Sequence, residues 1–114
     1  SLGVIGAFSI ECETLGLNED HLVSYSILKN YPNPFNPLTC IQYSLDDFSH
    51  FSLKVFDIHG SLIKTLKKGY GSPGIYEAIW DSKNDRGINV PSGIYFYQLS
   101  TISNITTNRM MLIK

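Results

Sequence analysis

Three of the five prolines in this 114-residue chain fall within seven positions, in the run Tyr31-Pro32-Asn33-Pro34-Phe35-Asn36-Pro37. Each proline fixes its own φ and biases the residue before it toward extended conformations. The run therefore cannot be helical, and it cannot lie inside a central strand, because proline donates no hydrogen bond to a sheet ladder. We predict that this run, which we call the proline motif, forms a rigid start to a folded domain. The side chains of Tyr31 and Phe35 are expected to pack against that domain.

The sequence after the proline motif alternates between apolar and polar residues, as half-buried strands do. Strands are predicted over residues 39–45, 51–58, 61–67, 75–81, 93–99 and 105–113, with turns or loops between them. We expect His59-Gly60 to form a two-residue hairpin turn. The run from Gly93 to Leu99 is the most apolar and should lie in the middle of a sheet. Short strands at this spacing, without a helical period, predict an all-β fold, an antiparallel β-sandwich of about seven strands.

One face of each predicted strand should form the core. Trp80 is the only tryptophan, and we interpret it as a core anchor and not as a platform for a ligand. In the strand from Thr39 to Leu45, alternation places Cys40, Gln42 and Ser44 on the outer face, so this strand is predicted to be half-buried. The predicted core consists of Ile41, Tyr43, Leu53, Val55, Trp80, Tyr95, Tyr97 and Leu99.

Residues 1–30 differ from the rest of the chain. The run from Leu2 to Cys12 is rich in β-branched, aromatic and small residues, which predicts an extra N-terminal strand, and residues 16–21 read as a polar linker. An isolated strand is not stable, so this strand needs a partner, which is the end of a preceding domain, the edge of this domain or another copy of the chain. We divide the chain into the N-terminal strand and linker, residues 1–30, and a β-sandwich domain, residues 31–114.

The composition and the motifs argue against several classes of function. A net charge of −1 predicts no nucleic acid partner, and no apolar run is long enough for a membrane span. The three histidines, His21, His50 and His59, lack the spacing of metal ligands. The run from Asp81 to Gly87 is loosely similar to a calcium loop, but Lys83 stands where an oxygen ligand is needed. No serine or cysteine has the context of an activated nucleophile. We therefore expect no cofactor, no metal and no enzymatic activity.

Several groups of residues together resemble a known family. They are the run from Asn30 to Pro37, then Leu53-Lys54-Val55-Phe56-Asp57-Ile58-His59-Gly60, then Trp80-Asp81, then Pro91-Ser92-Gly93-Ile94-Tyr95-Phe96-Tyr97, and finally Arg109-Met110-Met111-Leu112-Ile113-Lys114. In this order they resemble the C-terminal sorting domain of the type IX (Por) secretion system, over about residues 22–114. That fold is similar to the immunoglobulin-like domain of the flagellar hook-capping protein. The resemblance implies an immunoglobulin-like sandwich.

The resemblance also implies a function. A sorting domain directs a protein that has reached the periplasm across the outer membrane, so the protein is secreted or held at the cell surface, and the partner is the outer-membrane translocon. The residues expected to be recognised lie in the strand from residue 93 and in the last strand: Gly93, Tyr95, Arg109, Met110 and Lys114. The alternative is a retained structural subunit of an extracellular filament or surface assembly. Such a subunit would self-associate by donating its N-terminal strand to a neighbour's sheet edge.

The extracellular location that the resemblance implies makes Cys12 and Cys40 disulfide candidates. The family usually has a small hydroxyl residue where Cys40 stands. A bond within one chain would tie the N-terminal strand to the first strand of the sandwich, which we expect near a sheet edge. A bond between chains would link a donated strand to its acceptor. Two buried free thiols are the remaining alternative.

Overall fold

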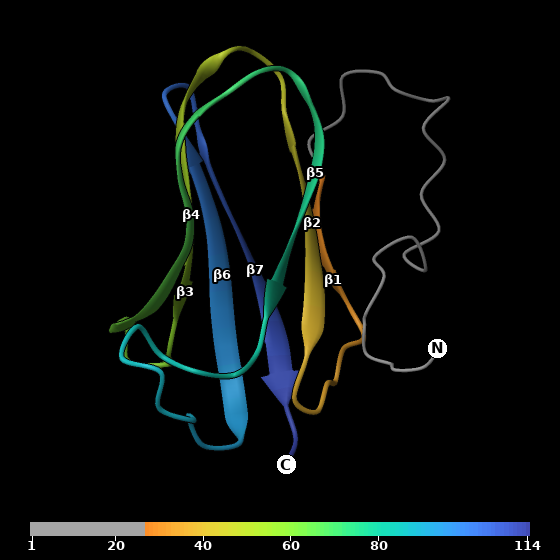
Figure 1. Cartoon of the computed structure of the whole chain (residues 1–114), viewed down its shortest axis with the longest axis vertical. Helices are drawn as coiled ribbons and strands as arrows, with labels where there is room; N and C mark the ends of the chain where they lie inside the picture. Colours follow the sequence, from red (N-terminus) through yellow and green to blue (C-terminus); the bar gives the residue numbers. More distant parts are fainter. Residues whose placement is uncertain (1–26) are drawn as a thin grey trace.

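The computed structural model describes residues 27–114, which form two antiparallel sheets packed face to face (Figure 1). The strands are β1 (Leu28–Tyr31), β2 (Thr39–Leu45), β3 (Ser49–Phe56), β4 (Leu62–Gly71), β5 (Gly74–Trp80), β6 (Gly93–Thr101) and β7 (Ile105–Leu112). The three-stranded sheet has the order β1-β2-β5, and the four-stranded sheet has the order β4-β3-β6-β7. Residues 27–114 include no helix that could cross a membrane. The predicted all-β sandwich of about seven strands is confirmed.

The core lies between the two sheets, where the inward-facing side chains of both sheets meet. All eight residues predicted to be buried are at most 6% exposed. Trp80 is fully buried, and its ring lies 5.7 Å from that of Phe35 and 5.4 Å from that of Tyr95, measured between centroids. Its indole Nε1–H donates a hydrogen bond to the carbonyl oxygen of Lys83 at 2.9 Å. The interpretation of Trp80 as a core anchor is confirmed, and β6 lies inside its sheet as predicted.

β2 departs from the predicted half-buried pattern. Cys40 and Gln42 alternate with the core residues Ile41 and Tyr43, yet they are only 2% and 6% exposed. The expectation that this strand lies near an edge is also wrong, because β1 adds to its free side and leaves β2 between β1 and β5. Alternation alone indicates neither the burial of the outer side chains Cys40 and Gln42 nor the central place of β2 in its sheet.

The sandwich begins before the proline motif. Leu28 of β1 is part of the core, and β1 pairs along its whole length with β2, from Leu28 opposite Tyr43 to Tyr31 opposite Cys40. The described sandwich therefore includes residues on both sides of the boundary predicted between residues 30 and 31.

The β3–β4 hairpin differs from the two-residue turn predicted at His59-Gly60. The backbone N–H of Asp57 donates to the carbonyl oxygen of Ser61 at 3.0 Å, so the loop between these two residues is one residue longer. Gly60, with φ of 82°, adopts the left-handed conformation that such a loop requires. The Oδ1 atom of Asp57 accepts hydrogen bonds from the backbone N–H groups of His59 and Ser61, both at 2.9 Å.

Candidate functional site

The proline motif lies against the free edge of β7. The backbone N–H of Phe35 donates to the carbonyl oxygen of Met111, and the carbonyl oxygen of Phe35 accepts from the N–H of Ile113, each at 3.0 Å. Asn33 extends the contact, because its Oδ1 accepts from the N–H of Met111 at 3.0 Å and its Nδ2 donates to the carbonyl oxygen of Arg109 at 3.4 Å. We call residues 33–35 together with residues 109–113 the terminal unit.

Within the proline motif, Phe35 is the only buried residue. Its side chain is 2% exposed, so the prediction that it packs against the domain is confirmed, and its ring contacts Trp80. Tyr31 is 50% exposed, so the expectation that it packs against the domain is wrong. On β1 the inward positions are Leu28 and Asn30, and alternation turns Tyr31 outward. The motif is thus anchored by a single buried aromatic ring together with backbone and side-chain hydrogen bonds.

A chain of polar side chains fixes the start of the motif. The amide Nδ2 of Asn30 donates to Oγ1 of Thr39 at 3.0 Å, and its Oδ1 accepts from the hydroxyl of Tyr97 at 2.9 Å. The hydroxyl of Thr39 in turn donates to the carbonyl oxygen of Pro32 at 2.9 Å. Because Tyr97 belongs to β6 and Asn30 to β1, these hydrogen bonds connect the two sheets directly beneath the motif.

The structure separates the five residues expected to be recognised by a translocon. Tyr95 and Met110 are opposite each other in the β6–β7 ladder and are 4% and 1% exposed. Their side chains are part of the core and are not accessible to a partner that binds the folded domain. Arg109 and Lys114 are exposed, and Gly93 is half-buried at the start of β6. The recognition role of these residues stays a prediction.

An apolar strip lies on the outer face of the four-stranded sheet. Phe56, Phe96 and Arg109 are neighbours in one row across β3, β6 and β7. The next row pairs Ile94 with Met111. These residues alternate with core residues of the same strands, so they point away from the core. Together with Ile58 of the β3–β4 loop, the apolar members form what we call the outer strip: Phe56, Ile58, Ile94, Phe96 and Met111.

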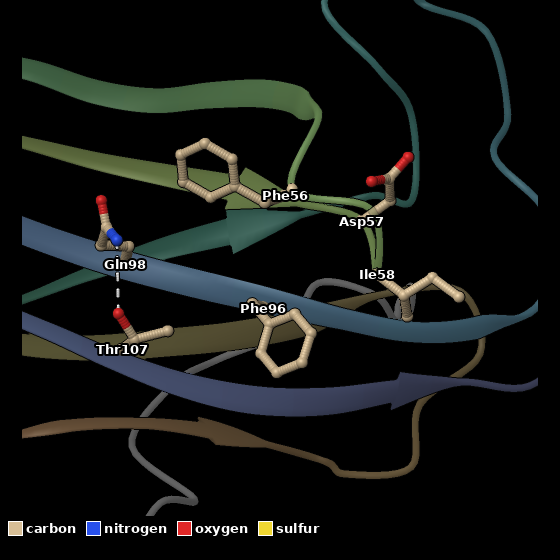
Figure 2. A pocket seen from close by; sticks show the side chains of 7 residues that line it. Phe56, Asp57, Ile58, Phe96, Gln98 and Thr107 are labelled. Carbon is tan, nitrogen blue, oxygen red and sulfur yellow. Dashed lines mark hydrogen bonds between the residues drawn. The ribbon is translucent and has the colours of Figure 1, made fainter.

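A shallow hollow of about 330 Å³ opens on this face (Figure 2). It is lined by Phe56, Asp57, Ile58, Gly60, Phe96, Gln98 and Thr107. The two phenyl rings and Ile58 provide apolar walls. Figure 2 shows Gln98 and Thr107 toward one end, joined by a hydrogen bond from Nε2 to Oγ1 of 3.3 Å, and Asp57 toward the other.

The charged side chains on the strands of this sheet are all basic. β3, β4, β6 and β7 contain no aspartate or glutamate, and their charged residues are Lys54, Lys64, Lys67, Lys68 and Arg109. The strands of the other sheet carry one charge of each sign, Lys29 and Glu77. The carboxylate in the hollow belongs to the β3–β4 loop, where the backbone N–H of Ser61 and then that of His59 lower the pKa of Asp57. Asp57 is therefore ionised at neutral pH, beside a sheet that is otherwise basic.

The outer strip and the hollow were missed by the sequence analysis, although two signals were available. Phe56 and Phe96 occupy outward positions in strands whose alternation is otherwise regular, and apolar residues at such positions indicate a contact surface. The second signal was charge: the predicted strands over residues 61–67, 93–99 and 105–113 contain no acidic residue, and the one over residues 51–58 contains only Asp57, near its end.

In the loop from Asp81 to Gly87, which was compared with a calcium loop, a side-chain oxygen accepts hydrogen bonds from nearby backbone groups. Oδ1 of Asn84 accepts hydrogen bonds from the backbone N–H groups of Arg86 at 2.9 Å and Ile88 at 3.0 Å. Within residues 27–114, no group of three or more histidine, cysteine, aspartate or glutamate side chains is arranged to hold a metal ion.

Cys40 is buried on β2 and is disulfide-bonded. Cys12 and the predicted N-terminal strand lie outside the described residues. The pairing of Cys12 with Cys40 and the donation of the N-terminal strand to a neighbour therefore stay predictions.

Comparison with known proteins extends the description of the fold. Residues 39–104 match the family of the FlgD Ig-like domain. No curated protein matches the chain. Among solved structures, dimeric latent PorU from Porphyromonas gingivalis aligns with a TM-score of 0.61 and 17% identity, over 81% of this chain and 10% of that chain.

Two further solved structures share the fold. PorZ, described as an essential bacterial surface component of the type-IX secretion system of P. gingivalis, aligns with a TM-score of 0.54 and 21% identity, over 76% of this chain and 11% of that one. FLGD from P. aeruginosa aligns with a TM-score of 0.52 and 19% identity, over 80% of this chain and 74% of that one. The chain thus spans about a tenth of the length of PorU and PorZ, and at these identities the likeness concerns the fold alone.

Proposed function

The chain belongs to the FlgD Ig-like domain family, and we propose that it serves as a sorting domain that directs the protein carrying it through a type IX secretion system. The partner is the outer-membrane translocon, and the destination, after passage through the periplasm, is the cell surface or the medium. The fold shared with PorU and with PorZ, a component of that system, supports the proposal. So do the motifs that resemble known sorting domains.

The observation that carries the proposal is the terminal unit. The proline motif and the last strand are two of the groups of residues that carry the resemblance to sorting domains, and they are far apart in the sequence, since 76 positions separate Asn33 from Arg109. In the folded chain these two stretches share hydrogen bonds through Phe35 and Asn33. A translocon that binds folded domains would meet both of them as one surface, with Arg109 exposed beside it.

Fusion of residues 1–114 to a periplasmic reporter protein tests the proposal. In a bacterium with an active type IX system, we expect the fused reporter in the medium or on the cell surface. The same fusion in a strain whose type IX system is inactivated should stay in the periplasm. Retention of a folded, protease-resistant fusion in the active strain would overturn the proposal.

Deletion of residues 109–114 is a poor test of recognition. Met110 and Leu112 are each 1% exposed and belong to the core, so the deletion also removes part of the fold. Substitution of the two exposed charges, Arg109→Glu with Lys114→Glu, leaves the core intact and should reduce export of the reporter. Lys83→Glu with Arg86→Glu, in the loop after β5, is the matched control and should leave export unchanged.

A further inference from the structure

We propose that the outer face of the four-stranded sheet binds an acidic segment of a partner protein, which places one apolar side chain in the hollow between Phe56 and Phe96. The proposal rests on the proposed function in one respect, that the partner would be a component of the translocon. The binding chemistry follows from the face itself and is testable without secretion.

The hollow has the size and lining for a side chain. Its volume of about 330 Å³ is at the lower limit of pockets that hold whole small molecules, which begin at roughly 300 Å³. Its walls are the rings of Phe56 and Phe96 and the aliphatic side chain of Ile58, which is 64% exposed. Burial of a partner's apolar side chain here would remove these walls from water, which is favourable in proportion to the apolar area covered.

The charges around the hollow determine whether an acidic or a basic partner is favoured. Arg109 is the neighbour of Phe96 on β7, and Lys54 is the neighbour of Gln98 on β3. Both point to the outer face, one on each side of β6, so carboxylates on a bound segment would meet a basic group on either side. Arg109 can bind a carboxylate with two parallel hydrogen bonds. Such complementarity favours an acidic partner and disfavours a basic one.

The lysines of β4 are weaker evidence for an acidic partner than Lys54 and Arg109 are. β4 is an edge strand, and lysines on edge strands also prevent unwanted pairing between sheets. Lys54 lies on β3, an inner strand, where no edge needs protection. The tests below therefore use Lys54 and Arg109.

A peptide segment fits this face better than an anionic membrane. A membrane presents a broad negative plane, which would meet the ionised carboxylate of Asp57 at the end of the hollow. An extended segment can pass Asp57 at a distance and still place one side chain between the rings. Gln98 and Thr107 offer it an amide and a hydroxyl for hydrogen bonds with its backbone.

Binding can be measured with isotopically labelled residues 1–114 and short synthetic peptides, followed by amide chemical shifts. The probe alternates glutamate and phenylalanine, one control replaces glutamate with lysine, and a second replaces phenylalanine with alanine. We expect only the first to bind, with shifts at residues 56–58, 96–98 and 107–109, and more weakly as salt rises. Equal binding of the alanine peptide, no binding of any peptide, or binding only to phosphatidylglycerol vesicles would overturn the proposal.

Variants locate the binding to this face. Lys54→Glu with Arg109→Glu, and separately Phe96→Ser, should weaken binding of the first peptide about tenfold or more, which corresponds to about 1.4 kcal/mol. Lys29→Glu, on the three-stranded sheet, should leave binding unchanged. Thermal unfolding of each variant excludes loss of the fold as the cause, and equal weakening by Lys29→Glu would contradict the assignment.

The reporter fusion separates this inference from the proposed function. If the fusion is exported and the Phe96→Ser variant is exported equally well, the sorting function stands and the binding face is wrong. If no fusion is exported but the acidic peptide binds as described, the sorting function is wrong and the binding face stands.

Discussion

The two sheets share one core but have different outer faces. On the three-stranded sheet, Cys40 and Gln42 are buried on the side away from the core, and the strand charges are one Lys29 and one Glu77. On the four-stranded sheet, the outer face carries apolar side chains that are half-buried or exposed, and its strand charges are all basic. The outer face of the three-stranded sheet is therefore closed along its central strand β2, while Tyr31, Ile75 and Ile79 on the flanking strands are 50%, 38% and 46% exposed. On the four-stranded sheet the inner strands β3 and β6 are themselves open, with Phe56 and Phe96 only half-buried.

The difference shows what alternation in a sequence does and does not report. β2 and β6 alternate in the same way, and in both strands alternation identifies the side chains that share a face. It does not report what covers that face. On β2 the outer side chains of Cys40 and Gln42 are buried, whereas on β6 the outer Phe96, a more apolar residue type, lines a hollow.

The largest expected effect concerns the ring that joins the two sheets to the proline motif. Phe35→Ala removes a side chain that is 2% exposed and packs on Trp80, so it should lower the free energy of unfolding by about 3–5 kcal/mol. Phe48→Ala, at a ring 66% exposed, is the matched control and should change it by about 0.5 kcal/mol or less. Urea unfolding measures both, and similar small effects would mean that the sheets hold together without the motif.

The next effect concerns the disulfide bond of Cys40 on β2. If Cys12 and Cys40 pair within one chain, Cys12→Ser should lower the free energy of unfolding by about 3–4 kcal/mol, through a less constrained unfolded chain. Electrophoresis of the extracellular protein with and without reductant identifies the bond. A small mobility shift on reduction indicates a bond within one chain, and a ladder that collapses indicates a bond between chains. Two titratable thiols per chain would reject both.

A smaller effect concerns the hydrogen bond between the sheets. Tyr97→Phe removes the donor to Oδ1 of Asn30 and should cost about 1 kcal/mol at neutral pH. Burial raises the pKa of the Tyr97 phenol above its ordinary value, so the fold favours the neutral form. The contribution of Tyr97 to the free energy of unfolding is therefore fully present below about pH 10 and is lost as the pH rises further.

Alkaline unfolding followed by circular dichroism measures this dependence. Tyr97→Phe should shift the alkaline midpoint upward, because the phenol that must ionise is gone. Tyr70→Phe, at a ring 71% exposed, should leave the midpoint unchanged. An unchanged midpoint in both variants would mean that Tyr97 does not couple the sheets.

The smallest effect concerns the buried outer side of β2. Oε1 of Gln42 is buried and has no hydrogen-bond partner among the described residues. Gln42→Leu should therefore raise the free energy of unfolding by about 1 kcal/mol, because a buried unpaired amide oxygen is unfavourable. Gln98→Leu, on the open face, should change it by about 0.5 kcal/mol or less. A loss of stability in Gln42→Leu would show that its amide is hydrated and its face open.

The fold was predictable from local signals to a large extent. Alternation placed Leu53, Val55, Tyr95 and Tyr97 in the core, and the single tryptophan identified the centre of packing. These predictions succeed because the side-chain period of a strand is a local property. The length of the β3–β4 loop was missed because it depends on how Asp57 and Ser61 pair across the hairpin.

The candidate site was less predictable, because it depends on contacts between distant parts of the chain. The proline motif and the last strand were each singled out, but nothing local to Phe35 indicates that it pairs with Met111 and Ile113. Tyr95 and Met110 belong to the motifs that resemble sorting domains, yet their side chains are in the core. The motifs that carry the resemblance thus include residues that build the core as well as residues on the surface.

The terminal unit can form only after the last residues of the domain have been synthesised. Residues 33–35 are synthesised long before residues 109–113, and until those later residues arrive, Phe35 lacks both of its backbone partners. A chain cut short or clipped within β7 would lack Met110 and Leu112 from the core as well. The surface that joins the two stretches can therefore form completely only on a molecule that is made and folded through Ile113. A receptor that binds this surface would not bind incomplete products, and no separate quality-control step would be needed.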